Sequence, residues 1–194
     1  MTRAILTVNS GSSSLKLGLF SETLETLAMA HVDRIGRREA AMQIKDADGR
    51  ALPNPPHVPN DFATNTQALR TALEVFQQDF PGLEVVVVGH RIVHGGINHA
   101  TPVRLTEAIM KDLAKLAPFA PLHQPHNLAG VRASVETFPG VPNIACFDTA
   151  FHRGHPFVND TFGLPRRFYE KGVRRYGFHG LSYDFISGEL AETE

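Results

Sequence analysis

The chain has 194 residues, of which 42% are hydrophobic and 20% charged, a composition typical of soluble globular proteins rather than disordered chains. Its 19 basic and 20 acidic side chains give a net charge of −1 without runs of like charge, so neither a nucleic-acid nor a membrane surface is favoured. The absence of a long apolar run argues against a membrane span, the single cysteine excludes an internal disulfide, and the amino terminus lacks a secretory signal, so we expect a cytoplasmic protein.

The first fifty residues predict an antiparallel meander. Residues 4–20 contain two apolar runs that flank a turn of small polar residues, SGSS, which is the pattern of strand, tight turn and strand. Residues 26–33 have the pattern of a further extended strand, and residues 39–49 end in an Asp-Gly turn dipeptide. Residues 51–60 carry four prolines, which exclude a helix or a central strand, so we interpret them as an exposed connector.

Helices and buried strands alternate in the rest of the chain. Asp61 and Thr64 are candidate caps of the first helix, and two apolar strands follow later. The predicted elements are a helix over 61–80, a strand over 83–88 that ends at Gly89-His90-Arg91, a helix from 106, a helix over 127–138, a strand over 143–147, a loop-like stretch and a helix from about 181. This order predicts an α/β protein with one mixed sheet and helices on both faces, as in a ribonuclease H-like core.

Polar residues follow both buried strands. Arg91 comes after the first strand and Asp148 after the second. Ligands in open sheets bind beyond the carboxyl ends of parallel strands, so these two residues could share one cleft. An arginine there can clamp a carboxylate or phosphate, and an acid can position a metal ion or nucleophile. The alternatives are a surface arginine beside a glycine turn and an acid that caps the next segment.

The turn in the first hairpin is a candidate anion site. Residues 9–16, NSGSSSLK, offer backbone N–H groups, hydroxyls and one ammonium group, a combination that suits a phosphate chain. The segment is no Walker A loop, because it lacks the second glycine and the Lys-Ser/Thr pair and leads into a strand. A serine-rich turn without function is the alternative.

Five segments together resemble the acetate and propionate kinase family: NSGSSSLK, GHRIVHGG, APLHQPHN, FDTAFH and RRYGFHG. They are spread across almost the whole chain. The resemblance implies the actin-like ATPase and sugar kinase superfamily, in which two ribonuclease H-like domains enclose the active site. Residues 1–150 would form the amino-terminal domain, and residues 151–194 would begin an incomplete second, nucleotide-binding domain.

The resemblance implies an acetate kinase, which reversibly transfers the γ-phosphoryl group of ATP to acetate and gives acetyl phosphate and ADP. The implied metal is magnesium or manganese. The expected partners are acetate or another short carboxylate and ATP or ADP, with no nucleic acid and no membrane, and the complete protein is expected to be a homodimer.

The resemblance also implies roles for individual residues. They are Asn9 for the metal, Ser12, Ser14 and Lys16 for the nucleotide phosphates, Arg91 for the substrate carboxylate, Val93, Leu122 and Phe178 for the apolar pocket, and His123, His179 and Asp148 for catalysis. A carboxylate needs no strong base to become a nucleophile, whereas its repulsion by the triphosphate must be offset. For Asp148 we therefore favour orientation of substrate and metal-bound water over proton transfer.

Two departures limit the resemblance. The family usually continues the last motif as GFHGTSH, whereas Leu181 and Tyr183 replace a hydroxyl and an imidazole here, which removes a potential hydrogen bond beside His179. The family's adenosine-binding glycine loops, a second catalytic arginine and a metal-binding glutamate lie downstream of residue 194. These 194 residues are therefore expected to hold only part of the machinery.

Three alternative functions stay open. The chain could be a non-catalytic fragment that binds phosphate or acetate weakly, or it could belong to a propionate kinase. A metal-dependent hydrolase is the third, with ligands drawn from three histidine groups: His90, His94 and His99; His123 and His126; and His152 and His155. The first group spans a strand end and a glycine turn, where the four-residue spacing of a helix does not align side chains, so this alternative is disfavoured.

Overall fold

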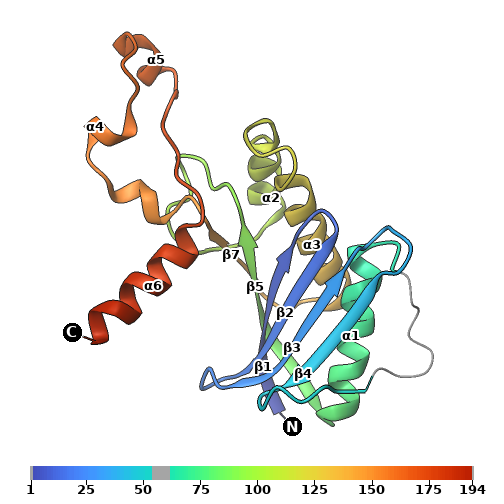
Figure 1. Cartoon of the computed structure of the whole chain (residues 1–194). Coiled ribbons are helices and arrows are strands. Elements are labelled where there is room, and N and C mark those ends of the chain that lie inside the picture. Colours follow the sequence, from blue (N-terminus) through green and yellow to red (C-terminus); the bar gives the residue numbers. More distant parts are fainter. Residues whose placement is uncertain (1, 54–61, 194) are drawn as a thin grey trace.

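A seven-stranded mixed sheet forms the body of the protein in the computed structural model, which describes residues 2–53 and 62–193 (Figure 1). The strand order is β4-β3-β2-β1-β5-β7-β6. The strands are β1 (Thr2–Ser10), β2 (Ser14–Ser21), β3 (Thr26–Asp33), β4 (Ala41–Asp46), β5 (Leu83–Ile92), β6 (Val103–Arg104) and β7 (Asn143–Phe147). Strands β1 to β4 are an antiparallel meander, whereas β5 is parallel to both β1 and β7.

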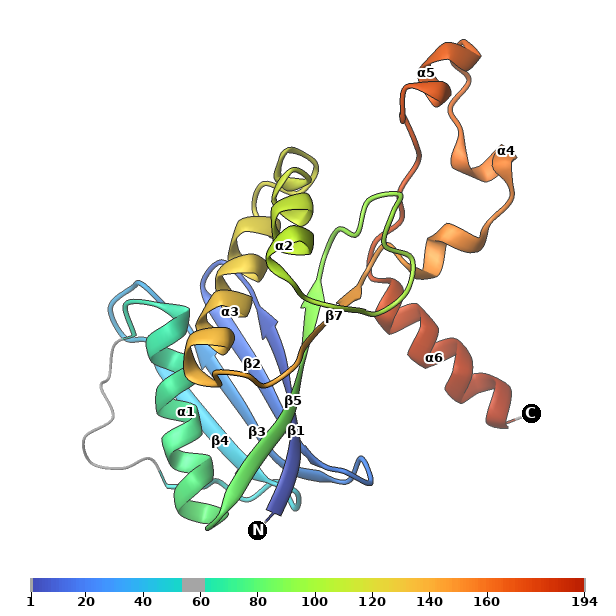
Figure 2. The ribbon, with the colours of Figure 1, turned by 180° about the vertical axis from the view of Figure 1, so that it is seen from behind.

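Two long helices cover one face of this sheet. Helix α1 packs on β2, β3 and β4, and α3 packs on β1, β5 and β7 (Figure 2). The helical segments are α1 (Asn65–Asp79), α2 (Glu107–Ala114), η1 (Ala117–Phe119), α3 (Gln124–Thr137), η2 (Phe151–Gly154), α4 (Phe157–Asp160), α5 (Arg166–Glu170) and α6 (Gly180–Thr193). Helix α6 contacts β7, and residues of α6 line a pocket together with Cys146 of β7. Because side chains alternate along a strand, Cys146 points to the face of the sheet away from α3. Helices therefore meet the mixed sheet from both sides, as predicted.

Alternation along the strands produces the core. In β1, Leu6 and Val8 point toward α1 and α3, and residues between them point to the other face. A second cluster, which includes Ile92, Leu113 and Phe147, lies where α2 and α3 pack against β5 and β7. Each fully buried side chain of this size contributes roughly 1.5–3 kcal/mol relative to an exposed one, so the strand ends that carry polar residues are firmly held.

The observed elements confirm most of the predicted order and correct its boundaries. Strand β5 does not end at Gly89-His90-Arg91, because these residues pair with β7 and the strand runs on to Ile92. Helix α3 begins at Gln124, earlier than predicted, since Pro125 suits a first helical turn. The sequence did not predict β6, α4 or α5. Thr64 caps α1 by accepting from the Gln67 N–H, whereas Asp61 and most of the proline-rich connector lie outside the described residues.

Between β7 and α6 the chain projects away from the sheet and returns, and we call residues 151–176 the arm (Figure 1). The buried carboxylate of Asp160 holds its base together. It accepts from Arg153 Nη1 over 2.7 Å, and Arg174 Nε lies 3.2 Å from its other oxygen. Burial alone would raise the pKa of Asp160, but hydrogen bonds from Arg153 and His155 and the nearby positive charges lower it.

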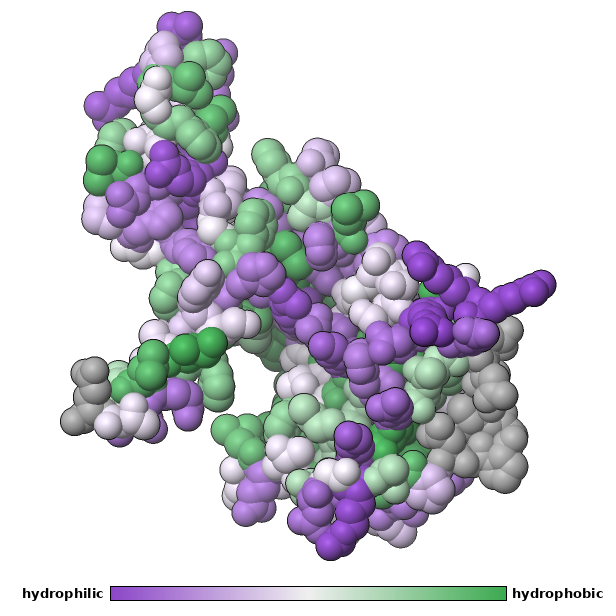
Figure 3. Space-filling model, in the orientation of Figure 1, coloured by the Kyte–Doolittle hydropathy of each residue, from purple (hydrophilic) through white to green (hydrophobic). Residues whose placement is uncertain are grey.

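Apolar side chains remain exposed on α6. They are Tyr183, Phe185, Ile186 and Leu190, and Figure 3 shows green apolar surface along this helix. Within residues 2–53 and 62–193, no helix has the length and apolar character that crossing a membrane requires.

Candidate active site

Most of the residues singled out by sequence line one pocket, at the carboxyl ends of β5 and β7. The cavity has a volume of about 370 Å³. Its lining consists of Arg91, Val93, Phe119, Ala120, Pro121, Leu122, His123, Asp148, Phe178 and His179. Seven of these were predicted site residues, and they come from four separate segments of the chain. One end of the lining is ionic and the rest is mainly apolar.

An ion pair between Arg91 and Asp148 forms the ionic end. Arg91 Nε donates to Asp148 Oδ1 over 3.0 Å, and Arg91 Nη2 donates to Oδ2 over 2.6 Å. The Asp148 side chain is 2% exposed and that of Arg91 33%. Hydrogen bonding to Asp148 raises the pKa of Arg91. Because the carboxylate holds one edge of the guanidinium, the arginine is oriented before any ligand arrives.

Asn9 lies on the other side of the same guanidinium. Its Oδ1 accepts from Arg91 Nη1 over 3.4 Å. Both residues lie on the face opposite α1 and α3, since Val8 and Ser10 are buried beneath these helices. Lys16 pairs with Asn9 across β1 and β2, but its exposed side chain lines a separate shallow groove on the sheet and not the pocket.

The hairpin turn between β1 and β2 is anchored from below. Ser10 Oγ accepts from Asn65 Nδ2 over 2.7 Å and donates to the carbonyl oxygen of His126 over 3.2 Å. The backbone of α3 also approaches closely, because a Cβ on Gly130 would lie only 2.7 Å from Ser10 Cβ. Ser12 and Ser14 lie at this anchored turn, outside the lining of the pocket.

Two amide side chains of α3 position the segment after β5, and the sequence analysis missed them. Asn127 Oδ1 accepts from the Val93 N–H over 2.9 Å, and its Nδ2 donates to the Ser10 carbonyl oxygen over 2.6 Å. Gln124 accepts from the His94 N–H over 3.2 Å and donates to the His94 carbonyl oxygen over 3.0 Å. Their spacing of three residues places both on one helix face. The sequence would have shown this spacing if the helix had been predicted to begin at Gln124 and not at residue 127.

The two predicted catalytic histidines precede helices. His123 is the residue before α3, and His179 stands before α6 with a left-handed φ of 57°. The Gly180 N–H donates to the Asp148 carbonyl oxygen over 2.9 Å, and a Cβ on Gly180 would overlap that oxygen. A strained backbone held this tightly is a feature of functional sites. The His179 segment is therefore fixed to the strand end that carries Asp148.

The residues that depart from the family motif have structural partners. Tyr183 stacks with Phe151 at 6.1 Å between ring centroids and meets His152 edge-on at 5.7 Å. His152 Nε2 lies 3.0 Å from the carbonyl oxygen of Phe178, to which it donates. Leu181 lines the small pocket beside β7. Tyr183, which stands where the family usually has a histidine, thus makes an aromatic contact with His152, and His152 supports the segment before His179.

The donor atoms fit a magnesium ion that takes most of its ligands from phosphate and water. The Asn9 amide oxygen and the Asp148 carboxylate both hydrogen-bond the Arg91 guanidinium, and oxygen is the ligand that magnesium prefers. In the part of the chain that the structure describes, no cluster of three or more His, Cys, Asp or Glu side chains could hold a metal ion.

Two of the histidines considered as hydrolase ligands, His90 and His94, have other roles. His90 Nε2 donates to Asn143 Oδ1 over 2.7 Å, and its burial lowers its pKa to about 4. His94 Nδ1 accepts from the Gly96 N–H over 2.9 Å, and burial lowers its pKa as well. The structure gives no support to a shared metal site for these two residues.

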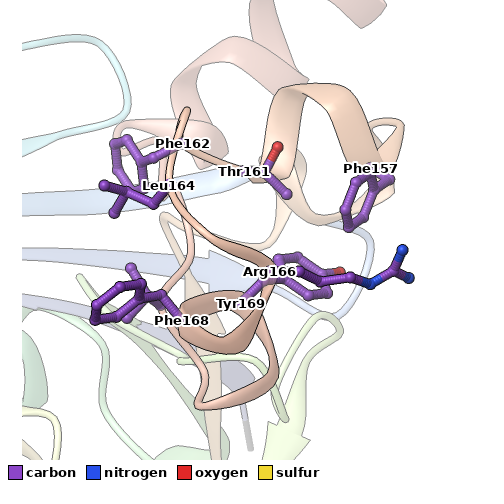
Figure 4. A pocket seen from close by; sticks show the side chains of 8 residues that line it. Phe157, Thr161, Phe162, Leu164, Arg166, Phe168 and Tyr169 are labelled. Atoms are coloured by element: carbon purple, nitrogen blue, oxygen red, sulfur yellow. The ribbon is translucent and has the colours of Figure 1, made fainter.

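A second cavity of about 280 Å³ lies within the arm (Figure 4). Its lining is mainly apolar and aromatic, and Arg166 stands over the Phe157 ring at 5.8 Å. Neither a carboxylate nor a histidine lines it. The pocket at β5 and β7 is therefore the better candidate for chemistry.

Comparison with known proteins shows the family of this chain. The model of the acetokinase family matches residues 4–193. The chain belongs to the acetokinase family. It is 46% identical to an acetate kinase of Methylocella silvestris and 45% identical to one of Rhizobium meliloti, and the matches cover 99% and 98% of this chain. They cover 50% and 49% of those relatives, so the chain spans about half their length, at their amino-terminal half.

Solved structures of this family share the fold. An acetate kinase of Porphyromonas gingivalis superposes with a TM-score of 0.84 at 32% identity, over 98% of this chain and 49% of that one. A propionate kinase of Francisella tularensis gives a TM-score of 0.85 at 27% identity, with the same coverage. The acetokinase fold is thus shown for nearly the whole chain.

Proposed function

We propose that this chain supplies the amino-terminal half of an acetate kinase active site, which transfers the γ-phosphoryl group of ATP to acetate and forms acetyl phosphate and ADP. One observation carries the proposal: a single pocket brings together Arg91, Asp148, His123 and His179 beside an apolar wall. That arrangement suits a ligand with an anionic head and a short apolar tail.

The ionic end of the pocket addresses the main obstacle to the reaction. Acetate is ionised at neutral pH, so it is already nucleophilic, but it must approach a polyanionic triphosphate. Arg91 keeps its charge at any working pH and, with His123 and His179, would bind the oxygens of the phosphoryl group in an in-line transition state. Such preorganised donors act without reorganisation during the reaction.

Asp148 acts in this proposal by orientation. Its carboxylate is buried and holds the Nε edge of Arg91, so the remaining N–H groups of that arginine can face the substrate carboxylate. Asn9 would help to hold magnesium or manganese, which would neutralise phosphate charge, and Asp148 would orient metal-bound water. Val93, Leu122 and Phe178 would contact the methyl group of the substrate.

The nucleotide would extend from this pocket toward the hairpin turn. Ser12, Ser14 and Lys16 offer hydroxyls and a cation there, on a turn that Asn65 and Asn127 anchor. The remaining groups for ATP, and the surface for a homodimer, would come from the carboxy-terminal half of a complete enzyme. Propionate is a second candidate substrate, because the mainly apolar lining also suits a longer chain and one structural relative is a propionate kinase.

A chimera tests this proposal. In it, residues 1–194 replace the matching amino-terminal half of the Methylocella silvestris acetate kinase. With ATP, magnesium and acetate, we expect the chimera to form acyl phosphate, measured by trapping with hydroxylamine, and the isolated chain to form none. A mixture of the isolated chain with the separate carboxy-terminal half should regain part of the activity. A folded chimera that forms no acyl phosphate would show that the proposed function is wrong.

A further inference from the structure

The pocket contains one large side chain to which no role has been given. Phe119 lies at the end of η1, lines the pocket and is 63% exposed. Its backbone belongs to a series of turn hydrogen bonds, in which Phe119 N donates to the Leu116 carbonyl oxygen, Ala120 N to that of Ala117 and His123 N to that of Ala120. The turn that carries Phe119 is therefore continuous with the one that leads to His123.

A buried histidine lies behind this ring. The His94 ring centroid is 5.5 Å from that of Phe119 and 5.8 Å from that of Phe178, so one ring supports both aromatic walls of the pocket. It also meets Tyr176 edge-on at 4.5 Å. His94 is 1% exposed, which makes it an interior platform and not a ligand in contact with solvent.

His94 is held in a single orientation at a cost. Its Nδ1 accepts from the Gly96 N–H, so the neutral ring carries its proton on Nε2. Among the described residues this buried Nε2 has no hydrogen-bond partner. A polar atom without a partner opposes folding, and a phenylalanine would avoid that cost. The His94 ring therefore holds the turn at Gly96 through a hydrogen bond and supports the Phe119 and Phe178 rings through contacts.

We propose that Phe119 sets the chain length of the carboxylate substrate and that His94 is the positioning residue behind it, an inference that rests on the proposed function. Removal of the Phe119 ring would open the pocket inward, onto the His94 and Tyr176 rings, where a longer apolar tail can lodge.

The test compares acetate, propionate and butyrate in two readouts. One is the dissociation constant of each acid for the isolated chain, from chemical-shift titration of labelled protein. The other is kcat/KM in the chimera. For Phe119→Ala we expect the preference for butyrate over acetate to rise about tenfold in both readouts, since one or two methylenes in an apolar pocket change discrimination by that order. The control Val135→Ala, on the outer side of α3, should change neither.

Further variants separate positioning from folding. His94→Asn removes the ring and should raise the butyrate preference in the same direction, whereas His94→Phe keeps a ring and should restore the preference for acetate. If Phe119→Ala fails to fold, Phe119→Leu should show a smaller change of the same sign. An unchanged preference in folded Phe119 variants would overturn the inference, and an unchanged preference in His94→Asn would remove the positioning role.

The two readouts also separate this inference from the proposed function. Turnover by the unmodified chimera with no effect of Phe119 would refute the inference alone. An inactive chimera, together with altered binding preferences in the isolated chain, would refute the kinase assignment and leave the chain-length role standing.

Discussion

At the scale of single residues, the pair formed by Arg91 and Asp148 joins stability to function. A buried carboxylate that loses its cationic partner is left with an uncompensated charge, which destabilises a fold more than loss of the whole pair does. One substitution at Arg91 therefore has two effects, on the fold and on the reaction, and a second substitution can separate them.

For Arg91→Ala we expect the chimera to lose at least about 100-fold in kcat/KM for acetate, as typical for removal of a charged transition-state donor. The isolated chain should lose about 1–3 kcal/mol of unfolding free energy, a value reduced for the partial exposure of the guanidinium. Steady-state kinetics and urea unfolding measure the two effects. The double variant Arg91→Ala with Asp148→Asn should recover stability without recovering activity. Recovery of both would contradict the substrate role of Arg91.

His90 provides a second prediction, on pH. Its folded-state pKa of about 4 lies below the ordinary value of 6.5, so the unfolded chain binds more protons between these values. The unfolding free energy should then fall as pH decreases from 6.5 to 4, by about 3 kcal/mol from this residue at 1.36 kcal/mol per unit. Urea unfolding across this range should show a shallower pH dependence in His90→Gln. Equal slopes in the two proteins would contradict this origin.

At the scale of elements, α3 organises the candidate site from below. Its amide side chains reach β1 and the segment after β5, and Gly130 lets its backbone approach the hairpin turn between β1 and β2. The helix thus sets the distance between two parts of the site that lie more than eighty residues apart in sequence. A small change on its inner face should be transmitted to the hairpin turn.

Gly130→Ala tests this contact. At an exposed helix position, a change from glycine to alanine would stabilise the folded protein by about 1 kcal/mol. At Gly130 the new Cβ would overlap Ser10, and such overpacking destabilises by about 1–3 kcal/mol. We expect a net loss of stability and a raised KM for ATP in the chimera. Gly188→Ala in α6 is the matched control, because its Cβ meets nothing within 4 Å. If both variants behave alike in unfolding and kinetics, Gly130 has no special role in holding the hairpin.

The sequence predicted the elements well where a pattern repeats along a strand or a helix. The meander and β7 follow from apolar runs, and Arg91 and Asp148 share one pocket as expected, although Arg91 lies within β5 and not after it. Asn127 was missed because Pro125 obscured the helix start, and Phe119 was missed since a single 3-10 turn has no periodicity to detect. The roles of the site residues in catalysis and in binding of substrate, nucleotide and metal stay predictions.

At the scale of the whole molecule, Asp160, Arg153 and Arg174 hold the outgoing and returning segments of the arm together. Arg153 lies shortly after the strand end with Asp148, and Arg174 lies shortly before the segment with His179, so the Asp160 carboxylate between them closes the base of the arm. Contacts of this kind are far apart in sequence, and no local pattern predicts them. The arm should therefore open without unfolding of the sheet when this link is cut.

Asp160→Asn tests that expectation. Loss of the charge leaves Arg153 and Arg174 without their shared partner, and trypsin cleavage at Arg166 and Arg167 should become about tenfold faster if opening of the arm costs roughly 1.4 kcal/mol less. Hydrogen exchange of the sheet amides should stay unchanged. Glu170→Gln, which affects an exposed pair with Arg166 on the same arm, should leave cleavage as it is. Equal cleavage of the Asp160 variant and the parent would show that the cluster does not hold the arm.

The parallel pairing of β1 with β5 has a consequence for biosynthesis. Thr2 aligns with Leu83, so the first strand to leave the ribosome waits about eighty residues for its partner. The meander can form earlier, but one edge of β1 then stays open, and an open edge invites pairing with other chains. Closing so long a loop is slow. In pulse-labelled exchange during refolding, amides between β1 and β5 should gain protection after those between β2 and β3, and simultaneous protection would contradict this order.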